Sequence, residues 1–584
     1  MSQTLTRHTT TMHSRDALVQ TVRHRGRFQV LIVGAGINGL GTFRDLSLQG
    51  VDCLIVDKGD FCSGASAAPS RMIHGGLKYL ETGAFRLVAE ATHERNRLLK
   101  NAAHLVQPLE MVIPLHSRTG GFLPALRRFF DGRTPIRTRG ALIVKAGLAL
   151  YDFLGRRDRV LPRHRMVGRA DAHAATPGLD PAIVAAGVYY DAWITAPERL
   201  AVELALDGMA ANGRSVALNY LSLVGARNGT IELRDELTGE VLSLETDLVV
   251  NAAGAWIDAA NRELAVPGRL IGGTKGSHLI LDAPELHDRL AGRMVYFESP
   301  DGRVCLLFPY LGKVLLGSTD IPVDDPDRAF CEDEEIDYIL AACRSVFPEV
   351  AVAREQIVFT YCGVRPLPAS PADDPGAVSR DHSIAFAEPT PTRPYPVMSL
   401  VGGKWTTFRA FAEEAADAAL KNLGGERRVS TAELPIGGGR GLSQQAESWD
   451  EIEKVIAASL PDDPRRASRL AKRYGSRGAA VARYCAGGQD RPLQTLPDYS
   501  LREIEFIVRG ELVAHLQDFV LGRSTIAITG RLHREAAEEL SEVLARVLGW
   551  DETRRRAEVT SLETVMRRRH RIDLDRARLA PALG

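Results

Sequence analysis

Residues 28–39 read Phe28-Gln-Val-Leu-Ile-Val33-Gly34-Ala-Gly36-Ile-Asn-Gly39, and this stretch decides the fold class. Its first half is a short apolar run rich in β-branched residues, which is typical of a buried parallel strand. Its second half has the Gly-x-Gly-x-x-Gly spacing of a turn where backbone approaches a pyrophosphate and a helix begins. Residues 40–49 then predict a helix, and residues 51–57 predict a second strand that ends in Asp57, placed to bind ribose hydroxyls. The stretch predicts a dinucleotide-binding βαβ unit and leaves FAD or NAD open.

Two further strand-to-glycine turns lie far along the chain. Residues 246–251 lead into Gly254, and residues 397–401 lead into Gly402 and Gly403. Between them, residues 303–309 and 313–319 have the short apolar runs and breaks of antiparallel sheet. After a glycine-rich stretch at 434–441 the pattern turns helical.

These patterns predict an α/β fold. A doubly wound, Rossmann-like nucleotide domain and an interleaved mixed-sheet substrate domain share residues 28–429, and an all-helical cap domain covers residues 430–584. Residues 1–27 hold five Arg, six Thr and one acid without an apolar core, which favours a disordered tail over a secretory signal; an organelle targeting peptide has a similar composition.

Composition excludes several classes of protein. The 584 residues carry 73 Lys and Arg against 73 Asp and Glu, so no global charge attracts nucleic acid or an anionic membrane. No apolar run reaches the roughly 18 residues of a spanning helix. The seven cysteines are scattered, without metal-binding spacing, which favours a reducing compartment and no metal site.

The loop at 63–81 contains Ser66, Ser70, Arg71, His74-Gly75-Gly76, Lys78 and Tyr79. Small and hydroxyl residues suit a loop that runs close to a large flat ligand. A histidine alone is more often structural, but beside a nucleotide motif His74 could supply the base that takes a hydroxyl proton in hydride chemistry.

Five motifs in order resemble FAD-dependent glycerol-3-phosphate dehydrogenase over residues 28–530. They are residues 33–39, the loop ending at 73–81, Thr274-Lys-Gly-Ser-His278, Gly363-Val-Arg365-Pro366 and Gly402-Gly-Lys404-Trp-Thr-Thr407. The resemblance implies FAD as cofactor, oxidation of sn-glycerol 3-phosphate to dihydroxyacetone phosphate, and a membrane quinone as electron acceptor.

The resemblance also implies the site residues. The expected cofactor contacts are Gly34, Gly36, Asn38, Gly39, Asp57, Ser66, Ser70, His74, Gly75, Ala253, Gly254, Trp256, Gly402, Gly403, Lys404 and Thr406. The expected substrate contacts are Lys78, Tyr79, Arg365, Arg380 and Lys404, and the catalytic set is His74, His278, Arg365 and Lys404.

Chemistry supports this assignment, because a dianionic phosphate in a partly dry pocket needs guanidinium forks or ammonium groups. Arg365 is the strongest candidate. The resemblance implies an Arg in many relatives at the position of Lys78, so a bidentate phosphate contact is not expected there. For the base, His74 ranks before His278.

Residues 118–169 hold thirteen Arg or Lys against three Asp, interleaved with aromatic and aliphatic residues. Such a segment can lie in the interface of an anionic leaflet, or it can be a solvated basic face over a core helix. With the resemblance, it predicts monotopic attachment to the cytoplasmic face of the cell membrane.

Other readings stay open at this stage. The acceptor could be oxygen, which would give hydrogen peroxide; the substrate could be another hydroxy acid or an amine; or the protein could be a flavin-binding sensor without turnover. The basic runs near the C-terminus lack aromatic interleaving, so nucleic acid is not expected as a partner. The sequence leaves the oligomeric state open, a homodimer included.

Overall fold

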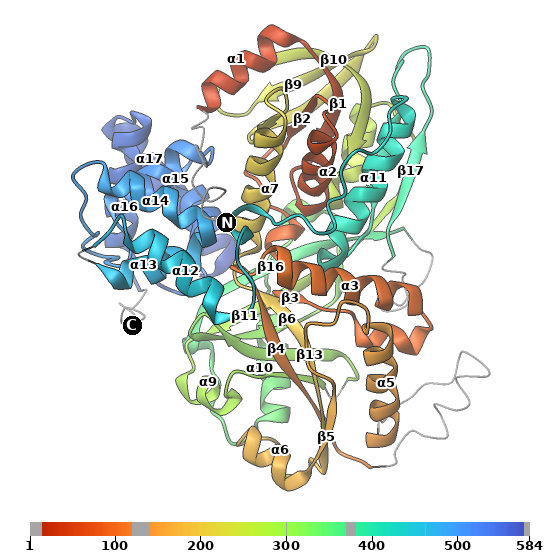
Figure 1. The fold of residues 1–584 in the computed structure, drawn as a ribbon, viewed down its shortest axis with the longest axis vertical. Coiled ribbons are helices and arrows are strands. Elements are labelled where there is room, and N and C mark those ends of the chain that lie inside the picture. Colours follow the sequence, from red (N-terminus) through yellow and green to blue (C-terminus); the bar gives the residue numbers. More distant parts are fainter. Residues whose placement is uncertain (1–13, 119–139, 300, 370–380, 462, 577–584) are drawn as a thin grey trace.

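The computed structural model describes residues 14–118, 140–299, 301–369, 381–461 and 463–576. Figure 1 shows three parts: a sheet flanked by helices at the top, a second sheet below it, and a group of helices at one side. The chain passes back and forth between the two sheets before it enters the helices.

The first sheet contains the predicted nucleotide unit. Its strand order is β17-β18-β10-β1-β2-β7, and all neighbours are parallel except β17 and β18. The strands are β1 (Arg27–Val33), β2 (Cys53–Val56), β7 (Val216–Leu218), β10 (Val241–Asn251), β17 (Ser383–Ala387) and β18 (Val397–Val401), with the hairpin β8 (Leu221–Arg227) and β9 (Thr230–Asp235) extending β10. Helix α2 (Ile37–Leu48) packs between α7 (Pro197–Ala211) and α11 (Phe408–Asn422). Because helices and loops cover both faces, β1 and β2 are apolar almost throughout.

The second sheet is mixed, as predicted. Strands β13 (Val304–Tyr310) and β14 (Lys313–Gly317) are antiparallel, whereas β12 (Met294–Glu298) and β4 (Val106–Leu115) are parallel. The other strands are β3 (Met72–Ile73), β5 (Arg165–Gly168), β6 (Ala185–Ile194), β11 (Ile271–Leu281), β15 (Ile321–Pro322) and β16 (Ile357–Pro368). Helices α3 (Phe85–Asn101), α5 (Ala141–Leu154), α6 (Arg169–Ala175), α9 (Pro284–Leu290) and α10 (Asp333–Val346) belong to this half, and α8 (Ile257–Glu263) follows β10. The interleaved α/β fold class is confirmed.

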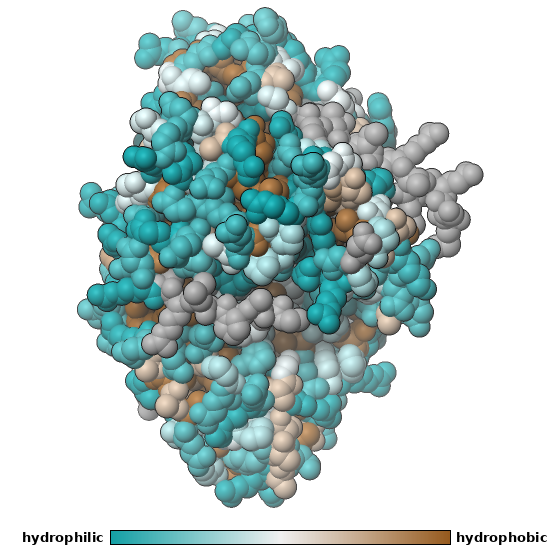
Figure 2. Space-filling model, turned by 90° about the vertical axis from the view of Figure 1, so that its left-hand side faces the viewer, coloured by the Kyte–Doolittle hydropathy of each residue, from teal (hydrophilic) through white to brown (hydrophobic). Residues whose placement is uncertain are grey.

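The C-terminal part is helical, as predicted. It contains α12 (Ala446–Ala457), α13 (Pro464–Tyr474), α14 (Gly478–Ala486), α15 (Leu501–Gly510), the π-helical turn η10 (Asp518–Arg523), α16 (Arg534–Leu548) and α17 (Glu552–His570). Helices α13 and α14 are separated at Gly475, which has φ of +56° and where a Cβ would lie 2.1 Å from the carbonyl oxygen of Gly438. The face that carries these helices is mostly hydrophilic, with apolar residues in small separate groups (Figure 2). Within the described ranges, no helix is both long and apolar enough to cross a membrane.

The predicted disordered tail is wrong for residues 15–25. They form helix α1 (Arg15–Arg25), whose Val19 and Val22 are buried against the first sheet. Arg15 anchors the helix through a salt bridge of 2.9 Å to Asp235. Apolar residues three apart supply a buried stripe, which a composition argument overlooks. Residues 1–13 lie outside the described residues.

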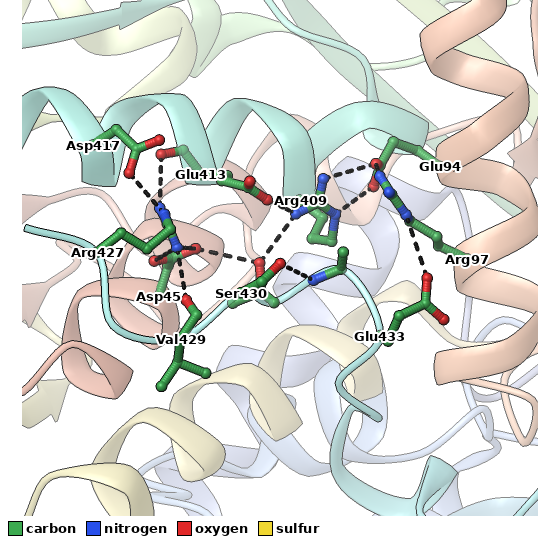
Figure 3. A network of polar contacts seen from close by, with 12 residues as sticks. Asp45, Glu94, Arg97, Arg409, Glu413, Asp417, Arg427, Val429, Ser430 and Glu433 are labelled. Carbon is green, nitrogen blue, oxygen red and sulfur yellow. Dashed lines mark hydrogen bonds and ion pairs between the residues drawn. The ribbon is translucent and has the colours of Figure 1, made fainter.

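The segment that leads to the C-terminal helices is clamped by buried charges (Figure 3). Arg427 donates to Asp45 at 2.9 Å and to Asp417 at 2.7 Å. Arg409 on α11 donates to both carboxylate oxygens of Glu94 on α3, at 2.7 and 2.8 Å. The glycines that follow are packed rather than free: a Cβ on Gly438 would lie 1.9 Å from the carbonyl oxygen of Tyr474. These ion pairs fix the segment to α2 and α11, and α11 to α3.

Candidate active site

The first glycine turn has the geometry that a phosphate-binding turn requires. Gly34 has φ of +102°, and a Cβ there would lie 2.6 Å from the carbonyl oxygen of Ala252. A Cβ on Gly39 would lie 2.0 Å from the carbonyl oxygen of Gly34, so only glycine lets α2 start this close to β1. The N–H of Ile37, in the first turn of α2, donates to Ser66 Oγ at 2.9 Å. The predicted loop residue Ser66 thus lies at the helix N-terminus.

A cavity of about 790 Å³ begins at this turn. That volume lies within the usual range of ligand pockets. Of the predicted cofactor residues, it is lined by Gly34, Gly36, Asn38, Asp57, Ser66, Ala253, Gly254 and Trp256. Three segments that together span about 220 residues of sequence therefore meet at one site.

Asp57 and Trp256 line this cavity and are held by further contacts. Asp57 accepts the N–H groups of Ala35 and Gly59 at 2.7 and 2.9 Å. Burial raises the pKa of Asp57 to about 6, although these two donors oppose the shift. The indole N–H of Trp256 donates to Asp327 at 3.0 Å, and Lys58 lies 4.4 Å from the ring centroid.

The second glycine turn, at Gly402 and Gly403, contacts the first. Both glycines have positive φ, +74° and +92°. Asn38 Nδ2 donates to the carbonyl oxygen of Gly402 at 3.4 Å. The N–H of His74 donates to Thr406 Oγ1 at 3.1 Å in η7 (Trp405–Thr407), so the histidine loop is tied to this turn.

The Lys404 side chain extends from the second glycine turn to the histidine loop at 63–81. Its ammonium group is 3.7 Å from the centroid of the Tyr79 ring, and a Cβ on Gly76 would lie 3.0 Å from its Nζ. Gly75 faces a different neighbour, because its N–H donates to the Tyr151 hydroxyl at 2.8 Å. Lys78, in η2 (Leu77–Thr82), is exposed and is not among the residues that line the cavity.

His278 and Arg365 come from paired strands of the second sheet, β11 and β16. His278 is buried, stacks on Tyr361 at 4.8 Å and has its Nε2 2.9 Å from Ser70 Oγ. Burial, together with the positive charges of Arg365 and Arg71, lowers the pKa of His278 from 6.5 to about 3. Arg365 donates to Asp320 at 2.9 Å, and its guanidinium packs against Gly276, where a Cβ would lie 2.2 Å away.

The structure gathers the predicted catalytic and substrate residues into two groups. His74, Lys404, Tyr79 and Thr406 lie at the second glycine turn, and His278, Ser70 and Arg365 lie where β11 and β16 reach the 63–81 loop. Gly39, Gly75, Gly402 and Gly403 allow close packing. Arg380 lies outside the described residues.

Comparison with known proteins gives a consistent result. Residues 29–418 match the family model described as FAD dependent oxidoreductase, and residues 429–555 match the C-terminal domain of alpha-glycerophosphate oxidase. The chain is 31% identical to a glycerol-3-phosphate dehydrogenase of Synechocystis sp. over 90% of this chain and 93% of that relative. It is also 31% identical to a glycerol-3-phosphate dehydrogenase of Pseudomonas tolaasii, over 86% and 92%.

The chain belongs to the FAD-dependent glycerol-3-phosphate dehydrogenase and oxidase family. Its fold is that of the glycerol-3-phosphate dehydrogenase from Bacillus halodurans, solved with FAD, at 24% identity, a TM-score of 0.74 and 98% coverage of both chains.

FAD is therefore the cofactor of this family member, and the cavity fits it. The N–H groups at the start of α2 suit the pyrophosphate, Asp57 suits the ribose hydroxyls, and the glycines at 402 and 403 admit a flat ring close to backbone.

Arg71 is a site residue that sequence reasoning missed. It donates to both oxygens of Glu198, at 2.8 and 2.9 Å, and lies between the rings of Tyr310 and Tyr361. Although burial opposes the shift, the Glu198 carboxylate raises the pKa of this guanidinium. Arg71 and Glu198 both line the FAD cavity. A loop arginine gives no sign in sequence that its partner is a carboxylate 127 residues away.

The helical domain also lines the FAD cavity. Residues of η10 and α17 contribute to its wall, among them Gln517, Asp518, Leu521, Arg569 and His570. Burial and the nearby Asp60 raise the pKa of the Asp518 carboxyl above its usual range. The stretch at 516–525 resembles the family's C-terminal cap, but the sequence left its role open between dimerisation, covering the flavin domain and docking on a bilayer, because helical periodicity identifies a buried face without identifying what it covers.

Proposed function

We propose that this protein oxidises sn-glycerol 3-phosphate to dihydroxyacetone phosphate and passes the electrons to a membrane quinone. The observation that carries the substrate is the hydrogen bond between the His74 loop and the turn that holds Lys404. This contact brings the His74 loop next to the Lys404 turn, which supports a role for His74 as proton acceptor and for Lys404 as phosphate-binding cation beside the flavin. The names of the relatives support the same substrate.

The side chains divide the work by their chemistry. Arg365 presents a planar fork and Lys404 a compact charge, which together suit a dianionic phosphate. Fixing the phosphate orients C2 for reaction. When bound, FAD supplies the redox step by accepting a hydride from C2. The C2 hydroxyl proton then passes to an imidazole as the carbonyl forms.

His74 remains the first-ranked base, because its backbone is fixed to the Lys404 turn. His278 is neutral at physiological pH, so it can accept a proton, but its low pKa makes it a weak acceptor in this arrangement. A bound phosphate dianion would offset the Arg365 charge and raise that pKa.

The quinone and membrane proposals rest on helix α5 and its surroundings. Leu142 and Phe153 are 54% and 55% exposed, and Arg156 lies 4.1 Å from the Phe153 ring centroid. Exposed apolar side chains beside basic ones favour attachment to an anionic leaflet, where a quinone is dissolved. We place the protein at the cytoplasmic face of the cell membrane.

A second candidate is an oxidase that uses oxygen. The match of residues 429–555 to the C-terminal domain of alpha-glycerophosphate oxidase favours it. Because that domain lines the FAD cavity in this chain, it is placed to influence which acceptor reaches the flavin.

Steady-state turnover separates the two candidates. We expect dihydroxyacetone phosphate to form only when a quinone is present in anionic vesicles, with little hydrogen peroxide. Peroxide in a one-to-one ratio with product, at the same rate without quinone, would establish the oxidase instead.

A further inference from the structure

Behind the second glycine turn, three potential metal ligands come together from three elements. Glu90 is on α3, His382 directly precedes β17, and Glu414 is on α11. One ligand atom from each lies within 4.8 Å of the others. None of these residues takes part in the proposed substrate site.

His382 is almost fully buried and is aimed into this cluster. Its side chain is 4% exposed and stacks on Phe411 at 4.3 Å. Its Nε2 lies 3.1 Å from Glu414 Oε2, and its Nδ1 lies 3.9 Å from Glu90 Oε1. Both Nδ1 and Glu90 Oε1 are buried, and neither has a hydrogen-bond partner within the part of the chain that the structure describes.

With a neutral imidazole, this arrangement has no positive charge between the two carboxylates. If Nε2–H donates to Glu414, then Nδ1 presents a lone pair towards a carboxylate oxygen, and two buried acceptors face each other. A distance of 3.9 Å is too long for a hydrogen bond between them. Burial of such groups is costly unless a cation compensates them.

The surrounding charges point the same way. Three carboxylates, of Glu90, Asp381 and Glu414, surround the imidazole, whereas the described residues in contact with them supply one guanidinium, that of Arg86. Arg86 pairs with Asp381 at 2.8 Å and is 77% exposed. Among the described residues, the carboxylates of Glu90 and Glu414 therefore face a neutral imidazole without a cationic side chain between them, and a divalent cation would balance their charge.

We propose that Glu90, His382 and Glu414 bind a divalent transition-metal ion of the zinc class. An imidazole with carboxylates suits zinc, which takes nitrogen and oxygen ligands at about 2.0 to 2.2 Å. Tetrahedral ligand atoms at that radius are about 3.4 Å apart, close to the separations of 3.1 and 3.9 Å seen here. Glu414 is 54% exposed, so its side chain can rotate to close the site and water can complete it.

The ion would connect three elements around the flavin turn. His382 follows Asp381, whose carbonyl oxygen would lie 2.8 Å from a Cβ on Gly402. Phe411, on which His382 stacks, would lie 3.1 Å from a Cβ on Gly403. The ion is thus a structural element behind the turn, and the inference does not depend on the substrate or the acceptor.

The test uses the full-length, FAD-loaded protein after dialysis against a chelator. Zinc is titrated by calorimetry, and cobalt is titrated by its visible absorption, which reports the ligand geometry. We expect one ion per chain in the wild-type protein. In His382→Gln and Glu414→Gln the affinity should fall at least about tenfold, as expected for loss of a ligand or of its support.

His116→Gln is the matched control, since His116 also pairs with a carboxylate, Asp180 at 3.1 Å, but is 59% exposed. Its affinity should equal that of the wild type. Glu414→Gln changes an exposed group, so its folding is not at risk, and the flavin spectrum checks this in each variant. The proposal would be overturned if the wild type bound no ion, or if His382→Gln and Glu414→Gln bound the ion with wild-type affinity.

Discussion

The two ends of the flavin site are built in different ways. At the nucleotide end, the turn geometry comes from twelve consecutive residues, and a Cβ at Gly34 or Gly39 would meet backbone within 2.6 Å. At the substrate end, His74, His278, Arg365 and Lys404 span about 330 residues. The pairing of β11 with β16 positions His278 and Arg365, and one hydrogen bond to Thr406 positions His74 beside Lys404. The first end obeys a local steric rule, and the second depends on the whole fold.

The largest expected effect follows from breaking the local rule. In Gly39→Val the new side chain collides with the Gly34 carbonyl, so the turn cannot form and the purified protein should contain almost no FAD. The ratio of flavin to protein absorbance measures this. Gly213→Ala is the control, because a Cβ there meets nothing within 4 Å. Normal FAD content in Gly39→Val would show that the turn is not the nucleotide site.

The next effect is the contribution of His278 to the loss of folding stability at low pH. Its folded-state pKa of about 3 is below the usual 6.5, so the folded protein binds fewer protons than the unfolded one between these values. The neutral His278 imidazole makes its full contribution to the unfolding free energy above pH 6.5. This contribution is lost as pH falls towards 3. Between pH 7 and pH 4, His278→Gln should lose less unfolding free energy than the wild type, by on the order of 3 kcal/mol.

Urea unfolding at the two pH values measures this difference. His287→Gln, on an imidazole that is 36% exposed beside Asp288, should behave like the wild type. Equal acid sensitivity of His278→Gln and the wild type would mean that His278 is solvated or protonated in the folded protein.

A smaller effect is expected at the phosphate fork. In Arg365→Ala the loss of a charge-assisted contact of about 1.5 to 3 kcal/mol should lower kcat/KM for glycerol 3-phosphate about 10- to 100-fold. FAD content should not change. Arg328→Ala, on a side chain that is 87% exposed, should keep wild-type kinetics. An unchanged kcat/KM in Arg365→Ala would move the phosphate to another cation.

The smallest effect lies outside the site. The double variant Leu142→Glu with Phe153→Glu should weaken binding to anionic vesicles about tenfold, since it replaces exposed apolar groups with repelled charges. Cosedimentation at low salt measures it. Val241→Glu, which is 51% exposed on the first sheet, should bind as the wild type does. If both variants sediment alike, the segment at 118–169 is a solvated basic face over a core helix.

These differences also explain what sequence could predict. The βαβ unit, the strand at 397–401 and the antiparallel pair at 304–317 depend on local patterns, and the structure confirms them. The helix at 15–25 was missed because two buried valines carry it within a polar composition. The Arg71–Glu198 pair and the wall formed by η10 and α17 depend on contacts between distant segments, which no motif encodes. The roles of His74, His278, Arg365 and Lys404 stay predictions until their variants are measured.

Anaerobic mixing with sn-glycerol 3-phosphate tests the central claim most directly. The claim is that the substrate end built around Lys404 and Arg365 delivers a hydride to the flavin held by the first turn. We predict that the visible flavin band bleaches at a rate that saturates with substrate concentration, whereas glycerol, which lacks the phosphate, leaves the flavin oxidised. A FAD-loaded protein whose flavin stays oxidised with glycerol 3-phosphate would contradict the account.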